Sequence, residues 1–317
     1  MKIETEFVDT TKQIGDLVDW LVLRHATPSL YPPTMYIDLE GKNLCREGSI
    51  SIFTLLMDTS TSTKRACLID VHTLGAHAFN TSGAKGKTLK DILQDENIPK
   101  VFFDVRNDSD ALFMHFGIAL LGVEDVQLME SATRKTTASR RLLNGLAKTV
   151  EDYIFAVPRG KEWANWKSTK ENGQRLFKAE YGGSYDIFNC RPIPEAIASY
   201  CVGDVQYLPE LREKFWAHKP RDWRAMVGEE FQKRVKASQR SDYQPHGRDR
   251  ALAPWSKEQN CTLDGWNYVP SYRHIDEVED DWHDDYNDGQ DDDWYDDGPT
   301  SCRDIISDCD MHLYYSD

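Results

Sequence analysis

The chain has 317 residues, and its net charge of −15 is concentrated at one end. Residues 251–317 hold 19 acidic and three basic side chains, whereas residues 1–250 are close to neutral, so the acidity belongs to a terminal segment. The seven cysteines form no CxxC pair, which argues against a zinc ribbon or a disulfide scaffold. The first thirty residues lack a basic stretch followed by an apolar run, and no stretch approaches a membrane span. We therefore expect an intracellular protein of the nucleus or cytoplasm, neither secreted nor membrane-bound.

Apolar spacing predicts strands in the first third of the chain and mostly helices after it. In chain order, the predicted elements are a helix at 11–25, strands at 35–37, 49–57 and 65–71, a helix at 88–94, a strand at 100–104, and helices at 108–121, 140–155, 160–179, 193–217 and 221–238. Strands with inserted helices, followed by a helical half, predict an α/β fold in which helices flank a mixed sheet.

Three parts are expected along the chain: a domain over 1–220 with its core at 30–217, a helical extension over 221–255, and a disordered acidic tail over 256–317. The stretch 276–297 holds 13 acidic residues among 22, so burial cannot offset its ordering entropy. Two hypotheses for the tail stay open. It binds a basic partner, or it folds back over a basic substrate channel and restrains substrate binding.

Three short motifs carry the candidate chemistry. Asp38 and Glu40 follow an apolar strand at positions i and i+2, so both carboxylates project to the same face. Asp108 begins a helix after the strand at 100–104. Tyr200 and Asp204 lie four residues apart on a predicted helix, which places the phenol beside the carboxylate.

Four carboxylates that converge on one place stay ionised only if cations neutralise them. Oxygen ligands alone favour Mg²⁺ or Mn²⁺ over zinc or copper. Two such ions about 4 Å apart can activate a water and stabilise the leaving oxygen in phosphoryl displacement. A tyrosine beside such a site can hold the attacking water in line.

The three motifs, in this order, resemble those of the DEDDy 3′–5′ exonuclease family, which includes ribonuclease D, Werner-type exonucleases and polymerase proofreading domains. The stretches "YIDLEGKNL", "KVFFDVRNDSDALF" and "YCVGDVQYLPEL" are similar to eukaryotic exonuclease-domain proteins related to the Egalitarian branch. The resemblance covers about residues 30–217. It implies a ribonuclease H-like fold and hydrolysis of RNA or DNA from the 3′ end to nucleoside 5′-monophosphates.

The resemblance also implies a role for each motif residue. Asp38, Glu40 and Asp204 would bind the first of two divalent cations, Mg²⁺ or Mn²⁺, and Asp38 would bridge to the second. Asp108 would reach the second cation, and Tyr200 would position the nucleophile.

Several alternatives stay open. Asp104 and Asp110 are alternative ligands in the second motif, and Tyr200 is alternatively a core tyrosine. By the same resemblance, Leu44, six residues after Asp38, would match the place where proofreading domains carry an apolar wedge between the last two bases of the substrate. The whole protein is alternatively a catalytically inactive, nucleic-acid-binding adaptor with the same fold, or a phosphodiesterase of small nucleotides.

Basic and aromatic side chains offer two further interpretations. The basic clusters either contact the phosphate backbone or form solvated helix faces. Trp163, Trp166 and Phe177 either stack on bases or pack in the core. The basic residues concerned are Arg134, Lys135, Arg140, Arg141, Lys148, Arg221, Arg224, Lys233, Arg234 and Lys236.

Overall fold

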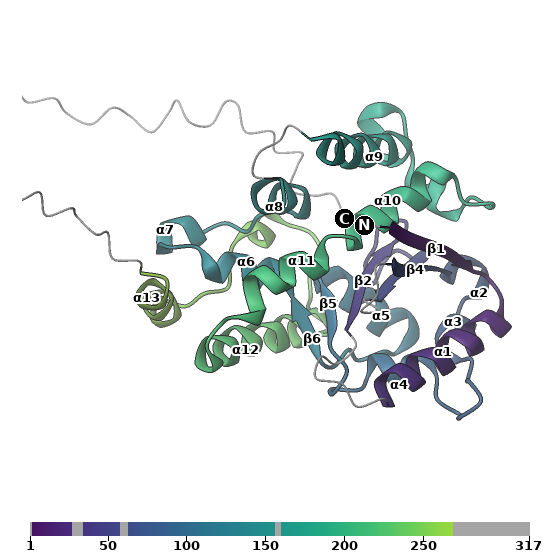
Figure 1. Ribbon diagram of the computed structural model, residues 1–317, viewed down its shortest axis with the longest axis horizontal. Coiled ribbons are helices and arrows are strands. Elements are labelled where there is room, and N and C mark those ends of the chain that lie inside the picture. Colours follow the sequence, from purple (N-terminus) through teal and green to yellow (C-terminus); the bar gives the residue numbers. More distant parts are fainter. Residues whose placement is uncertain (1, 27–33, 58–62, 156–159, 269–317) are drawn as a thin grey trace, which may run out of the picture. The chain divides into compact units, whose positions relative to one another are not determined.

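Six strands form one mixed sheet in the computed structural model, which describes residues 2–26, 34–57, 63–155 and 160–268 (Figure 1). The spatial order is β1-β4-β3-β2-β5-β6. β3 runs antiparallel to both of its neighbours, and the other pairs are parallel. The strands are β1 (Lys2–Val8), β2 (Met35–Glu40), β3 (Ile52–Met57), β4 (Thr63–Asp70), β5 (Lys100–Phe102) and β6 (Val123–Asp125).

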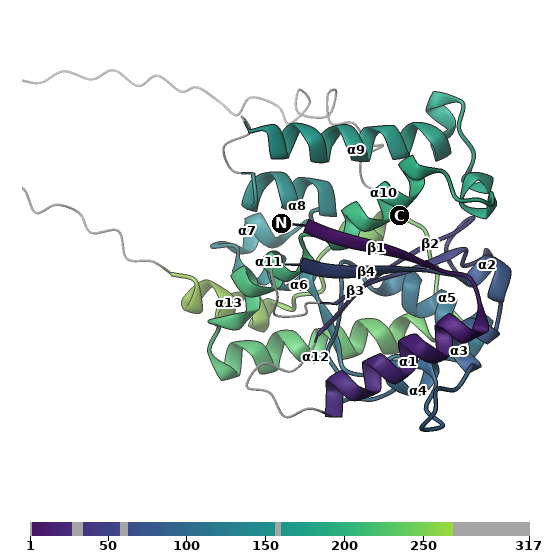
Figure 2. The ribbon, with the colours of Figure 1, turned by 45° about the vertical axis from the view of Figure 1, so that its right-hand side comes forward.

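Helices cover both faces of this sheet, as Figure 2 shows for α8, α9 and α10 on one side of the strands and α1, α3 and α4 on the other. The helices are α1 (Thr11–Ala26), α2 (Val71–Leu74), α3 (His77–Asn80), α4 (Leu89–Leu93), α5 (Arg106–Phe116), α6 (Val126–Thr133), α7 (Thr137–Arg140), α8 (Leu146–Tyr153), α9 (Lys161–Phe177), α10 (Glu195–Val205), α11 (Leu208–Arg212), α12 (Arg221–Ser238) and α13 (Lys257–Trp266). Within the described ranges, none of them is long and apolar enough to span a membrane.

Alternation along β2 divides the interior into separate cores. Ile37 and Leu39 point into an apolar cluster shared with α1, α4 and α5. Tyr36 points to the opposite face, where it packs with side chains of α6, α11 and α12. Asp38 and Glu40 follow Tyr36 at spacings of two, so they share this second face.

The expected α/β architecture is confirmed, and so are the helix at 11–25 and the strands near 35, 52, 65 and 100. The helix predicted over 193–217 is divided into α10, α11 and a π-helical turn at Glu213–Ala217. β1 was not predicted.

The expectation of disorder from residue 256 onward is wrong over Lys257–Trp266, which form α13. Ser256 caps this helix, and a reciprocal bond with Gln259 completes a capping box. The rest of the predicted tail, from residue 269, lies outside the described residues.

A buried ion pair fixes α12 to the sheet. Arg234 Nη1 donates to Asp125 Oδ2 over 2.7 Å and to Gln127 Oε1 over 3.0 Å. Asp125 also accepts from the backbone N–H of Asp104 and Val105, at the start of the β5–α5 connection. The predicted extension at 221–255 thus begins with a helix that contacts α5, α6 and β6.

Replacing Arg234 by Met is expected to lower the free energy of unfolding by about 3 kcal/mol, because Asp125 is fully buried and would lose its counter-charge. Urea denaturation measures the change. Lys236→Met, on the exposed side of the same helix, is the matched control and should change stability by less than about 0.5 kcal/mol. Equal stability of the two variants would contradict an anchoring role for Arg234.

Candidate active site

The carboxyl end of β2 supplies two acidic side chains to the sheet face that α10 covers. Asp38 lies opposite Thr54 in the β2–β3 ladder, and Glu40 lies opposite Ile52. β2 is paired on both sides, with β3 and β5, so its backbone is fixed in the middle of the sheet. Both carboxylates therefore project from a rigid support.

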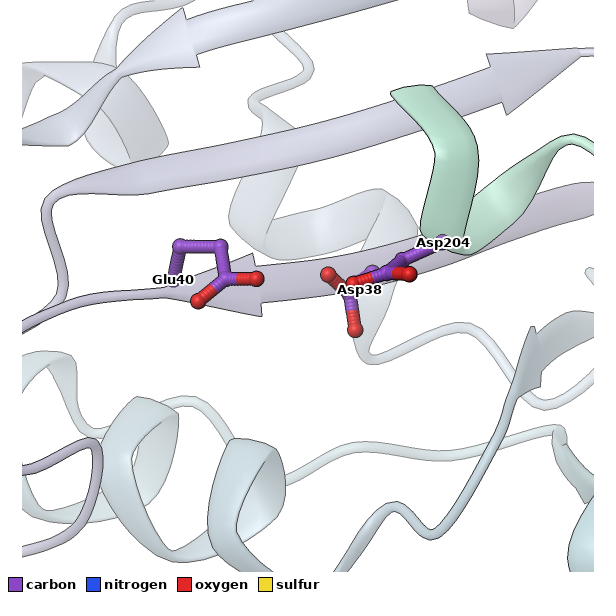
Figure 3. Close-up of side chains that lie close together, drawn as sticks. All are labelled: Asp38, Glu40 and Asp204. Atoms are coloured by element: carbon purple, nitrogen blue, oxygen red, sulfur yellow. The ribbon is translucent and has the colours of Figure 1, made fainter. Parts of the chain in front are cut away.

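The helix α10 brings a third carboxylate to the same place. α10 packs against β2 and β3, and Asp204 on its last turn approaches Asp38 (Figure 3). One oxygen each of Asp38, Glu40 and Asp204 lie within 4.8 Å of one another. Glu40 and Asp204 are both buried, each 6% exposed. Two distant motifs of the sequence thus form a single acidic cluster.

A neighbouring thiol experiences the charge of this cluster. Cys201 is fully buried on α10, one turn before Asp204. Burial raises its pKa well above the ordinary value, and the charges of Glu40, Asp38 and Asp204 raise it further. The thiol is therefore protonated and unreactive at neutral pH.

The three carboxylates fit a hard divalent cation. Oxygen ligands on opposite sides of such an ion are about 4–5 Å apart, close to the spacing within the cluster. The donor set contains oxygen alone, which favours Mg²⁺ or Mn²⁺. Divalent-cation binding is the chemistry that this arrangement supports.

The second motif lies at the same end of the sheet as the acidic cluster, because β5 runs parallel to β2 and the carboxyl ends of both strands lie there. After β5 the chain turns sharply at Asp104, whose φ of +63° lies in the left-handed region that aspartate tolerates better than most residues. Asp108 follows in the first turn of α5 and is 4% exposed. Among the described residues, the acidic cluster comprises Asp38, Glu40 and Asp204 and does not include Asp108.

Arginines bind the two alternative ligands of this motif. Asp104 accepts from both Nε and Nη2 of Arg106. Burial alone would raise the pKa of Asp104, but Arg106 and Arg234 outweigh it and lower the pKa to about 2. Asp110 accepts from the backbone N–H and from Nε of Arg46, over 2.7 and 2.8 Å. These pairs give Asp104 and Asp110 arginine partners, and Asp108 stays the second-motif residue that the sequence predicts.

Tyr200 and Leu44 are both buried in apolar surroundings. The Tyr200 ring is 3% exposed and packs edge-on against Phe177, with 5.2 Å between ring centroids. The Tyr200 ring can pack in the core while the residue lies one helical turn from Asp204, so the packing does not decide between a core role and a role in the site. Leu44 is 5% exposed within the main apolar core, which gives a wedge between bases no support.

Sequence reasoning missed a lysine in the candidate site. Lys170 on α9 donates from Nζ to Asp204 Oδ1 over 2.6 Å, and the same ammonium lies 5.0 Å from the centroid of the Tyr200 ring. A lysine among the polar residues of a predicted helix gives no sign of its direction. The only available signal was its spacing from the apolar residues Trp166 and Phe177 on one helix face.

The structure decides several of the basic and aromatic interpretations. Arg134, Arg140 and Arg234 form internal ion pairs with Glu130, Asp264 and Asp125, so they stabilise the fold. Trp166 and Phe177 are buried at 6% and 2% exposure and pack in the core.

Comparison of the chain with known protein families agrees with this geometry. A family model described as 3'-5' exonuclease matches residues 21–218, more than half of the chain. The chain belongs to the 3′–5′ exonuclease family. The resemblance to DEDDy-type members that the motifs indicated is thereby confirmed.

Two curated proteins are similar in sequence to part of this exonuclease-family chain. The piRNA biogenesis protein EXD1 of Mus musculus is 27% identical over 173 residues, which are 55% of this chain and 27% of that protein. Its Homo sapiens counterpart is 26% identical over 173 residues, 55% of this chain and 30% of that protein. The matched part thus spans less than a third of either relative.

Solved structures match the fold of this family member. Trypanosoma brucei RNase D in complex with RNA U12 gives a TM-score of 0.61 at 19% identity, over 83% of this chain and 79% of that one. Its complex with GMP gives the same TM-score over 71% of that chain. The mixed sheet flanked by helices is therefore a ribonuclease H-like fold, as expected.

Gly173→Ala tests the close contact between α9 and the third motif. A Cβ at Gly173 would lie 2.5 Å from Tyr200 Cβ and 2.7 Å from its Cγ, so α9 or Tyr200 must shift. We expect a loss of about 1–3 kcal/mol in the free energy of unfolding, as in other overpacked contacts. Gly203→Ala is the matched control on α10, because its Cβ would meet nothing within 4 Å and alanine favours the helix. Unfolding in urea measures both, and a G173A protein as stable as the wild type would refute the contact.

Proposed function

We propose that the protein is a metal-dependent 3′–5′ exonuclease that removes 3′-terminal nucleotides from a polynucleotide as nucleoside 5′-monophosphates. The observation that carries this proposal is the buried cluster of Asp38, Glu40 and Asp204, with oxygens within 4.8 Å of one another. Three carboxylates at that spacing are stable together when they share a divalent cation. Membership of the 3′–5′ exonuclease family supports the same reaction.

In the proposed mechanism, Asp38, Glu40 and Asp204 would hold the divalent cations, and Asp108 would contribute a further carboxylate from the start of α5. Bound ions of this kind activate a water and stabilise the departing oxygen. The Tyr200 hydroxyl orients the water for in-line attack on phosphorus. The bond from phosphorus to the 3′ oxygen of the preceding nucleotide breaks, so the phosphate leaves with the terminal nucleotide and the shortened strand keeps a 3′-hydroxyl.

A second candidate function is nucleic-acid binding without turnover. The observation that favours it is the ion pair between Lys170 and Asp204, because a side-chain cation contacts one of the proposed metal ligands. Such a protein would keep the fold, bind nucleic acid and act as an adaptor. The two functions differ in one measurable property, metal-dependent cleavage.

Cleavage of a 5′-labelled oligonucleotide, as RNA and as DNA, with Mg²⁺ or Mn²⁺ tests the proposal. We expect a ladder that shortens from the 3′ end and is abolished by EDTA. Asp38→Asn should lower the rate by about 10³-fold, because one of the three negative charges in the cluster is lost. Comparison of the RNA and DNA cleavage rates on the same gel gives the preference for ribose or deoxyribose.

The matched control for this assay is Glu47→Gln, an exposed carboxylate in the connection after β2, which should retain full activity. Intact oligonucleotide that nevertheless shifts in a native gel would establish the adaptor. If the oligonucleotide is neither cleaved nor shifted, nucleic acid is not the substrate class of this protein.

Tyr200→Phe separates the two roles of this side chain. The substitution keeps the ring that packs against Phe177 and removes only the hydroxyl, so the free energy of unfolding should fall by no more than about 1 kcal/mol. Loss of an oriented water should lower the turnover rate by about 10²-fold. Single-turnover kinetics with saturating protein measure this rate, and an undiminished rate would leave Tyr200 as a core tyrosine only.

A further inference from the structure

One face of α9 is directed at the candidate site. Trp166, Lys170, Gly173 and Phe177 are spaced by four, three and four residues, so they lie along a single stripe of the helix. Trp166 and Phe177 are buried, and Gly173 allows α9 to approach the side chain of Tyr200 closely. Lys170 is the charged member of this otherwise apolar and small stripe.

The contacts of Lys170 involve both residues of the third motif. Its Nζ lies 2.6 Å from Asp204 Oδ1 and 5.0 Å from the Tyr200 ring centroid. The Lys170 side chain is 13% exposed and that of Asp204 is 6% exposed. A lysine directed into an apolar interface is costly unless a carboxylate compensates it, so this position is fixed by the acidic cluster.

An ammonium in this position affects any cation that binds the cluster. Asp38, Glu40 and Asp204 form a group of three negative charges within 4.8 Å, and Lys170 neutralises part of that charge. A divalent cation that binds the same carboxylates gains less attraction in the presence of the ammonium, because the two cations repel at short range. Asp204 is the ligand for which they compete most directly.

We propose that Lys170 is a positioning residue of the metal site: its ammonium holds the Asp204 carboxylate in the metal-free protein and weakens the binding of the divalent cation. This inference rests on the proposed function. It predicts that the Asp204 carboxylate is held in place before a cation binds. It also predicts that Lys170 lowers the affinity for the cation, so that occupancy of the site depends on the cation concentration.

Titration of the full chain with Mn²⁺ tests the inference without relying on cleavage. In Lys170→Met, the dissociation constant for Mn²⁺ should fall about 10-fold, within the usual range for coupled sites. The metal-free variant should be less stable than the wild type, because Asp204 stays buried without its counter-charge. Saturating Mn²⁺ should raise the unfolding temperature more in this variant than in the wild type.

Three variants complete the experiment. Lys170→Arg keeps the charge and should bind Mn²⁺ like the wild type, and Lys170→Gln, which removes the charge but keeps a hydrogen-bond donor, should tighten binding and serves if the Met variant does not fold. Lys167→Met, an exposed lysine one turn earlier on α9, is the matched control and should change nothing. If Lys170 had only a structural role, its replacement by Met would lower the stability of the protein equally with and without Mn²⁺.

The outcomes separate this inference from the proposed function. If the wild type binds Mn²⁺, and Asp38→Asn abolishes that binding, but Lys170→Met binds with unchanged or weaker affinity, then the inference is wrong and the proposed function stands. If the wild type binds no Mn²⁺ at millimolar concentration, both are overturned.

Discussion

Mutual repulsion among three carboxylates is the constraint around which this part of the molecule is built. Asp38, Glu40 and Asp204 have oxygens within 4.8 Å of one another, and two of the three are buried. Like charges at this distance stay together only if the supporting backbone is rigid and a counter-charge is supplied. The rigidity comes from β2, which is paired on both sides, and from α10, which packs against it. The central position of β2 in the sheet is thus the condition for the candidate chemistry.

The fold treats four other aspartates near this end of the sheet differently, of which Asp70, Asp110 and Asp125 are buried and Asp104 is partly exposed. Each of the four is bound by an arginine, which neutralises it with directed hydrogen bonds. The pairs are Asp70–Arg191, Asp104–Arg106, Asp110–Arg46 and Asp125–Arg234. Asp204, by contrast, contacts a lysine, a compact charge on a flexible stem that can move away from a carboxylate more readily than a bidentate guanidinium. The basic residue that contacts each aspartate therefore differs between the four that hold the fold and Asp204, which we propose as a metal ligand.

Much of the fold and part of the site could be predicted because their signals are local. The apolar alternation of β2 and the four-residue spacing of Tyr200 and Asp204 specify directions without knowledge of the rest of the chain. β1 was missed because its sequence, KIETEFV, carries two glutamates and is stabilised as a strand by its pairing with β4. α13 was missed although its capping box was readable, because the acidic composition of the following segment dominated the interpretation. The spacing of Lys170 from Trp166 and Phe177 indicates its face of α9, but the contact with Asp204 depends on how α9 packs against α10.

The position of β1 limits how this protein can be shortened. The family match begins at residue 21 and ends at 218, so it leaves out β1 at one end and α12 at the other. A protein trimmed to those limits would expose the hydrogen-bonding edge of β4, where seven residues of β1 now pair in register. It would also remove the counter-charge of Asp125. An unpaired strand edge is a template for association between copies. Such a fragment would aggregate through β4, and its inactivity would say nothing about the acidic cluster.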